Sequence, residues 1–361
     1  MGELKVIDAD GHVLEREAGI DWAARLDPAV RDLAPRLTKG VPGMYVEGKR
    51  WPIPAGPGVG VPFNADRNYR AGQADPVLRL QDMDLEGIDQ AVLFSTIFGL
   101  TAINALQNKA LAAALARAYN DWLAEYCAAD PRRLKGVALV PMQDVPAAVA
   151  EARRAVTERG MVALMVSANV GGRNLDHPEF EPLYQVAEEV DVPICVHIGL
   201  GCYGSLPAGT ERFDNYLFTH LVGHPFEQVI ALACLTAGGV LERHPRLRVA
   251  FMEAGCSWVP YWLGRLDEHY EVMHTLIPHL PRRPSEYVRR GQCYFSCEPD
   301  EEGVPYVLET LGEDVVLYAS DYAHFDCKFP KSVQIILERA DLSEGTKRKI
   351  LRENAARLYR L

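Results

Sequence analysis

The feature that most constrains the fold is a regular alternation between short apolar segments and segments with a helical apolar period. Strands that are apolar along their whole length are typical of parallel sheets covered on both faces. Eight such strands joined by helices predict a closed (β/α)8 barrel of the TIM type. The expected strands cover 6–12, 90–96, 135–142, 161–169, 192–199, 247–255, 293–299 and 315–321. The expected helices cover 76–88, 103–128, 144–159, 179–190, 225–243, 257–276, 303–311, 331–340 and 343–359.

The main alternative is an open, doubly wound α/β sheet. Such sheets normally carry a glycine-rich phosphate-binding loop after the first strand, and no such loop follows the stretch 6–12. The 361 residues, 48% of them hydrophobic, are sufficient for one large core. We therefore expect a single barrel domain over 1–361.

A long segment between the first strand and the first barrel helix has no clear period. It covers about 16–76, is rich in proline and glycine, and contains Trp22, Tyr45 and Trp51. Loops of this length are usually functional lids or disordered, and aromatic residues that need burial favour a lid. We expect residues 16–76 to be an insertion that covers the mouth of the barrel and shapes its pocket.

The charge and the cysteine pattern narrow the class of protein. A net charge of −11 with acidic and basic residues interspersed argues against nucleic acid or an anionic membrane as a partner. No apolar run reaches the roughly 20 residues of a membrane-spanning helix, and the N-terminus does not resemble a secretory signal. The eight cysteines are scattered, several within apolar strands. We expect a reduced, cytoplasmic protein.

Polar side chains stand where the predicted strands end. Asp10 and His12 are two residues apart on the first strand, so their side chains point the same way. Taken singly, such residues have simpler explanations, such as a core histidine or a helix cap. A row of polar groups at one end of a barrel is costly to bury without partners, and that end is where barrel active sites lie. The pattern predicts a metal site among Asp10, His12, His197, Glu253, Glu298 and Asp321, with five of the six converging.

Three further histidines are candidates for this site. His220 and His224 lie four residues apart after the strand 192–199 and would share one face of a helix. The alternative is that His224 caps a helix that begins at Pro225. His324 follows the last strand and is a candidate for proton transfer or substrate contact.

Taken together and in order, several motifs resemble the amidohydrolase superfamily. The similar branch contains aminocarboxymuconate-semialdehyde decarboxylase and γ-resorcylate decarboxylase. The resemblance implies a metal ion at the barrel mouth, held by Asp10, His12, His197 and Asp321. The motifs that carry it are "IDADGH", "PICVHIG", "GVLERHPRLRVAFMEAG", "WVPYWLGRLDE" and "ASDYAHFD".

Two departures from the family pattern concern metal binding. Asp10 stands where the family commonly has a histidine, and Glu253 replaces a histidine of the sixth strand that serves as acid, base or ligand. Oxygen in place of nitrogen shifts the preference from zinc toward manganese or iron. The stretch 161–169 has no lysine to bridge two metals, but Glu253 has two oxygens that can do so. With His220 and His224, these ligands suffice for two divalent metals per chain.

These residues favour a non-haem two-metal oxygenase (Fe/Fe or Mn/Fe) that uses O2 to hydroxylate a small or medium organic acid, with Glu253 and His324 as its catalytic residues. The alternative is a mononuclear hydrolase or decarboxylase, with zinc still compatible, in which His324 or a carboxylate moves protons. A non-catalytic barrel subunit is a third interpretation. We also expect a homo- or hetero-oligomer.

Overall fold

The computed structural model describes residues 4–37, 44–51, 69–96, 98–99, 103–197 and 207–361. Eight strands form one sheet, and all neighbouring pairs are parallel. In sheet order they are β1 (Ile7–Val13), β4 (Gln90–Ser95), β5 (Leu134–Leu139), β6 (Ala163–Val166), β9 (Ile194–Val196), β10 (Val249–Phe251), β11 (Cys293–Cys297) and β12 (Val316–Tyr318).

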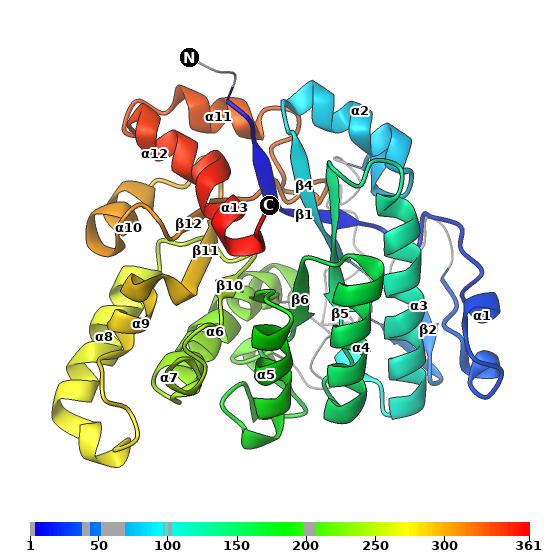
Figure 1. Cartoon of the computed structure of the whole chain (residues 1–361), viewed down its shortest axis with the longest axis horizontal. Coiled ribbons are helices and arrows are strands. Elements are labelled where there is room, and N and C mark those ends of the chain that lie inside the picture. The colour runs from blue at the N-terminus through cyan, green and yellow to red at the C-terminus, as the bar shows by residue number, and fades with distance from the viewer. Residues whose placement is uncertain (1–3, 38–43, 52–68, 97, 100–102, 198–206) are drawn as a thin grey trace.

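Backbone hydrogen bonds bring the two ends of this sheet together. The N–H of His12 donates to the carbonyl of Tyr322 at 2.7 Å, and the N–H of Asp321 donates to the carbonyl of Asp10 at 2.9 Å. The first strand is thereby joined to the segment that follows the last strand, at the end where the strands finish. The predicted (β/α)8 barrel is confirmed (Figure 1).

Helices surround the strands (Figure 1). Their bounds are α1 (Trp22–Arg25), α2 (Pro76–Glu86), α3 (Lys109–Cys127), α4 (Val145–Arg159), α5 (Glu181–Glu189), α6 (Tyr216–Thr236), α7 (Val240–Arg243), α8 (Val259–Met273), α9 (Pro284–Tyr287), α10 (Val304–Leu311), α11 (Ser332–Glu338), α12 (Glu344–Arg348) and α13 (Asn354–Tyr359). None of the helices that the structure describes is long and apolar enough to cross a membrane.

Local sequence signals fix several helix ends. The side chain of Asp144 caps α4 by accepting from the N–H of Ala147 at 3.2 Å, as expected, and Gly160 ends the helix with a left-handed φ of 70°. Most strands, by contrast, are shorter than the apolar runs that predict them. In the run 161–169, for example, the barrel strand β6 covers four residues, because the apolar sequence continues past the last ladder hydrogen bond.

The predicted start of two helices was wrong. The helix expected at 225–243 is α6, which begins at Tyr216 and passes through Pro225, followed by the separate α7. Asn215 caps α6 by accepting from the N–H of Leu217 at 2.9 Å, so His224 does not cap a helix. The helix expected at 103–128 begins as α3 at Lys109, after a separate 3₁₀ turn at Ile103–Ala105. The final helix expected at 343–359 is confirmed, because α12, a π-helical turn at Lys349–Glu353 and α13 follow one another without a break.

Parts of the segment 16–76 are described, including a hairpin of β2 (Met44–Val46) and β3 (Lys49–Trp51). The Glu47 carboxylate in this hairpin accepts from the N–H groups of Gln107 and Asn108 at 3.0 and 2.6 Å. Asn108 caps α3, the helix that follows β4, so the hairpin lies at the end of the barrel where the strands finish. The Trp51 side chain lies outside the described part, and the lid and its bounds stay a prediction.

Candidate metal centre

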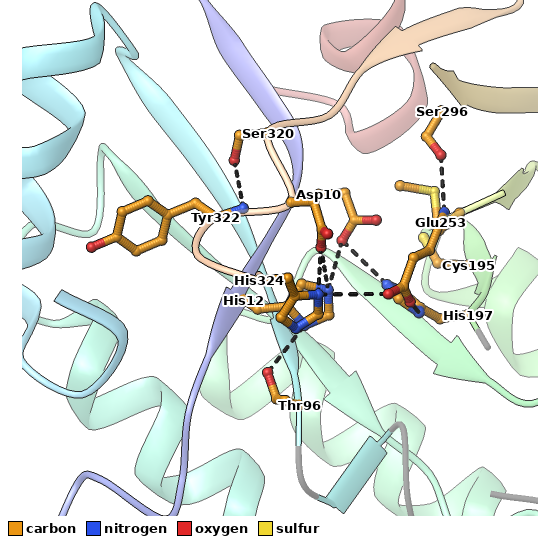
Figure 2. A network of polar contacts seen from close by, with 12 residues as sticks. Asp10, His12, Thr96, Cys195, His197, Glu253, Ser296, Ser320, Tyr322 and His324 are labelled. Atoms are coloured by element: carbon orange, nitrogen blue, oxygen red, sulfur yellow. Dashed lines mark hydrogen bonds and ion pairs between the residues drawn. The ribbon is translucent and has the colours of Figure 1, made fainter. Parts of the chain in front are cut away.

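Side chains from four strand ends meet inside the mouth of the barrel (Figure 2). The Nε2 atom of His197 lies 3.3 Å from Oδ1 of Asp10, and Nε2 of His12 lies 3.5 Å from the same oxygen. The His12 nitrogen also lies 3.6 Å from Oδ1 of Asp321. These distances bring together the four residues to which the family resemblance assigns the metal.

Glu253 and His324 complete the cluster. The Nδ1 atom of His324 lies 2.7 Å from Oδ1 of Asp321 and 3.5 Å from Oε1 of Glu253. The other Glu253 oxygen, Oε2, lies 3.2 Å from Nδ1 of His197. The His324 ring stacks on the His12 ring, with centroids 4.1 Å apart. Five of the six strand-end candidates therefore converge as predicted, whereas Glu298 is exposed.

Two of these residues have an uncommon backbone conformation. Glu253 and Asp321 have positive φ angles of 58° and 50°, which are sterically unfavourable for residues other than glycine and concentrate at functional sites. Hydrogen bonds hold both backbones in place. The N–H of Glu253 donates to Oγ of Ser296 at 3.0 Å, and the N–H of Asp321 donates to the Asp10 carbonyl.

The cluster has the properties expected of a metal site. Asp10, His12 and His197 are at least 99% buried. Nε2 of His12 is buried without a hydrogen bond among the described residues, and it faces Oδ1 of Asp321, which contacts His324, at 3.6 Å. Leaving a buried nitrogen unpaired is costly, and a cation next to His12 would satisfy it and balance the charge of the neighbouring carboxylates. By their spacing, two overlapping groups are able to hold an ion: Asp10, His12 and His197, and His12, Asp321 and His324.

The two stacked imidazoles differ in protonation. Burial, with the neighbouring His324 and His197, holds the pKa of His12 well below its usual value, so its ring is neutral and has a lone pair for a metal. Burial also works to lower the pKa of His324, but the Asp321 carboxylate and then Glu253 outweigh it and raise that pKa well above the usual value. His324 is therefore protonated in the metal-free protein.

His220 and His224 lie beside this cluster on α6, one helical turn apart, with ring centroids 4.4 Å apart. Neither belongs to the two groups able to hold an ion among the described residues. Nδ1 of His224 lies 3.1 Å from the His220 carbonyl, and the His220 ring packs near Phe325 at 5.5 Å. Burial, followed by His224, lowers the pKa of His220 to about 4. Their role as metal ligands stays a prediction.

One residue behind the strand ends was not anticipated from the sequence. Gln228 on α6 is fully buried, and its Nε2 donates to the carbonyls of Val196 at 2.9 Å and Met252 at 2.7 Å. These carbonyls immediately precede His197 and Glu253, so one side chain fixes both strand ends. The only signal in the sequence is a polar residue one turn after His224 within an apolar helix.

A family model described as Amidohydrolase matches residues 7–361. The chain is 30% identical over 290 residues to 2-amino-3-carboxymuconate-6-semialdehyde decarboxylase of Dictyostelium discoideum, covering 78% of this chain and 75% of that protein. It is 29% identical over 311 residues to gamma-resorcylate decarboxylase of Rhodococcus jostii, covering 79% and 89%. The chain belongs to the amidohydrolase family, and the resemblance recognised in its sequence is confirmed.

Solved structures agree on the fold. The 5-carboxyvanillate decarboxylase of Novosphingobium aromaticivorans, with bound manganese, has a TM-score of 0.72 at 23% identity, covering 99% of this chain and 97% of that chain. A 2,6-dihydroxybenzoate decarboxylase in complex with 2,6-dihydroxybenzoate has a TM-score of 0.65 at 26% identity, covering 78% and 87%. The two curated relatives and the 2,6-dihydroxybenzoate enzyme are decarboxylases, so the comparisons favour the decarboxylase alternative and lend no support to the oxygenase or to iron.

Proposed function

We propose that this chain is a metal-dependent decarboxylase of a small unsaturated or aromatic carboxylic acid. The observation that carries the proposal is the buried cluster at the barrel mouth, in which the unpaired Nε2 of His12 faces carboxylate oxygens of Asp10 and Asp321 at 3.5 and 3.6 Å. We assign one divalent ion to Asp10, His12, His197 and Asp321, whose two imidazoles and two carboxylates form a mixed nitrogen and oxygen set. The decarboxylase names of the relatives support the type of reaction.

Manganese is the metal that this ligand set favours. Carboxylate-rich sites suit harder cations than imidazole-only or thiolate sites, and manganese is bound in the related 5-carboxyvanillate and dihydroxybenzoic acid decarboxylase structures. When bound, the ion would act as a Lewis acid toward substrate oxygen atoms and stabilise negative charge that develops on them.

His324 is the residue that we assign to proton transfer. Decarboxylation breaks the bond between the carboxylate carbon and its neighbour, leaves the electron pair on that neighbour and requires a proton there. Asp321 and Glu253 contact Nδ1 of His324 and keep the ring charged. Nε2 lies on the opposite edge of the ring, and we assign the donated proton to this atom.

Glu253 takes a different role from the histidine that it replaces. An ionised carboxylate cannot donate a proton. The pKa of Glu253 is raised by burial, but the hydrogen bond from His324 and the nearby His224 and His197 outweigh this effect and hold it well below its usual value. We therefore assign Glu253 to orienting His324 and His197, which it contacts through separate oxygens.

The second candidate is the two-metal oxygenase expected from the sequence. The observation in its favour is the position of His224, which is buried and close enough to Glu253 to lower the pKa of that carboxylate. A second ion held by Glu253 with His220 or His224 would suit O2 chemistry. The two candidates differ in metal stoichiometry, in O2 uptake and in CO2 release.

The test is CO2 release from a panel of acids by metal-stripped protein reconstituted with manganese, zinc or iron. The panel includes 2,6-dihydroxybenzoate, 5-carboxyvanillate and non-aromatic unsaturated acids. We expect metal-dependent CO2 release that His324→Asn abolishes. The control His269→Asn, at an exposed position on α8, should leave it unchanged. CO2 release that persists in the His324 variant would refute the assigned proton donor, and product formation that consumes O2 would favour the second candidate.

A further inference from the structure

A buried arginine on a helix outside the barrel sheet contacts the backbone of a candidate metal ligand. Arg79 lies on α2, and only 1% of its side chain is exposed. Its Nη1 donates to the carbonyl of His12 at 2.9 Å, and its Nη2 lies 3.8 Å from Oδ2 of Asp8. Its guanidinium carbon lies 4.0 Å from the centroid of the Tyr322 ring. Arg79 thus contacts the backbone or neighbours of two candidate ligands, His12 and Asp321.

Asp8, the partner of Arg79, joins the two chain segments that carry three of the four candidate ligands. Its carboxylate accepts from the N–H of Ser320 at 2.8 Å and from the Ser320 hydroxyl at 2.6 Å. It also accepts from the N–H of Asp10 at 3.2 Å. Ser320 immediately precedes Asp321 in the chain. The pair of Asp8 and Arg79 therefore holds β1 against the segment after β12.

Two glycines, Gly11 and Gly72, lie so close to Arg79 that a side chain at either position would collide with it. A Cβ atom on Gly11 would lie 2.4 Å from Nη2 of Arg79 and 2.8 Å from Oδ2 of Asp8. A Cβ atom on Gly72 would lie 2.9 Å from the Arg79 Cα atom and 2.5 Å from the Tyr322 hydroxyl. Such separations are too short for any other residue without movement. Gly11 in the Asp10-Gly11-His12 motif is thus explained by the guanidinium packed against it.

Stability alone does not account for a buried ion pair. Desolvation of the two charges offsets most of their attraction, and well-packed apolar residues of similar volume are often at least as stabilising. An arginine additionally provides a rigid, planar guanidinium group, whose N–H donors fix the positions of the groups that accept from them. At this position the hydrogen-bond acceptor is the His12 carbonyl. The guanidinium charge lies 3.8 Å from the Asp8 carboxylate, which binds the N–H groups of Asp10 and Ser320.

We propose that Asp8 and Arg79 are positioning residues for the metal ion, which set the spacing of Asp10, His12 and Asp321 without contacting the ion. This inference rests on the proposed function, because it requires a metal at the cluster. Substitution of residues that hold metal ligands in place without contacting the metal typically changes metal affinity about 10–100-fold. We expect an effect of that size from removing the pair.

The test compares two double variants of the full chain. Asp8→Asn with Arg79→Met removes both charges at nearly constant volume. Glu151→Gln with Arg154→Met does the same to a buried pair on α4, where Nη2 of Arg154 lies 2.6 Å from Oε1 of Glu151. Manganese alone is titrated into each metal-stripped protein by calorimetry, and the bound ion is examined by electron paramagnetic resonance. Thermal unfolding of the metal-free proteins reports on stability.

We expect Asp8→Asn/Arg79→Met to weaken manganese binding about 10–100-fold and to broaden the spectrum of the bound ion, whereas the α4 variant keeps wild-type affinity. Arg79→Lys, which retains the charge without the fork, should fold and bind manganese more weakly than wild type. Wild-type affinity in both Arg79 variants, or equal weakening in the α4 control, would overturn the inference. Wild-type protein that binds no manganese, iron or zinc would instead overturn the proposed function.

Discussion

Replacing Gln228 with methionine should weaken metal binding, although Gln228 is not one of the candidate metal ligands. Methionine has nearly the same length as glutamine and fills the same space, but it cannot donate a hydrogen bond. The substitution removes the bonds from Nε2 to the Val196 and Met252 carbonyls. Both carbonyls lie one residue before a side chain of the cluster, so the ends of β9 and β10 become free to separate.

The expected loss of stability follows from the bonding of these two carbonyls. The Val196 carbonyl keeps one partner, because it also accepts from the N–H of Met252 at 3.1 Å. The Met252 carbonyl loses the donor that the structure describes. A buried unsatisfied carbonyl costs about 1–3 kcal/mol, and a lost hydrogen bond about 0.5–1.5 kcal/mol. Gln228→Met should therefore lower the free energy of unfolding by about 2–4 kcal/mol and weaken metal binding about 10–100-fold.

Gln292 provides a matched control at the opposite end of the barrel. It is buried just before β11, and its Nε2 donates to the carbonyls of Leu241 at 3.1 Å and His244 at 3.0 Å. Gln292→Met should lose similar stability in denaturant unfolding of the metal-free protein but keep wild-type affinity for manganese in calorimetry. Equal effects of the two variants on metal affinity would refute the idea that Gln228 acts on the site.

Three further predictions concern the cluster itself. His12→Ala and His197→Ala should each lose most of the bound metal, measured by elemental analysis, while circular dichroism stays that of the wild type; full retention of metal would refute their assignment. Metal binding should compete with protons for the carboxylates, because burial raises the pKa of Asp321 well above its usual value, so affinity should rise with pH; calorimetry in two buffers of different ionisation enthalpy measures this, and a pH-independent affinity would contradict it. Glu253→Gln should retain one metal per chain and lose turnover; loss of a second metal would instead support the oxygenase.

Much of the fold and of the cluster could be predicted because both depend on local sequence patterns. Apolar runs identify parallel strands, and parallel strands bring their ends to one edge. Asp10, His12, His197, Glu253 and Asp321 therefore converge without any knowledge of the loops. Glu298 also follows the end of a strand but is exposed; its N–H donates to Oε2 of Glu301 at 3.3 Å, a contact within the loop after β11 that no strand pattern indicates.

The parts that the sequence did not predict depend on contacts between distant segments. The helical spacing of His220 and His224 is correct, but the path of α6 through Pro225 and its anchor at Gln228 decide where their rings lie. Asp8 and Arg79 are 71 residues apart, and no local pattern pairs them. The prediction of two metals and O2 chemistry was based on the number of possible ligands, which included both His220 and His224.

The central claim is metal-dependent decarboxylation at the mouth of the barrel. The most direct test measures CO2 and O2 together in one sealed reaction of the manganese-loaded protein with an accepted acid from the panel. The account predicts one CO2 released per product formed, no O2 uptake, the same rate in anaerobic buffer and no reaction after the metal is removed. Turnover that consumes O2 in proportion to product, or that survives removal of the metal, would contradict it.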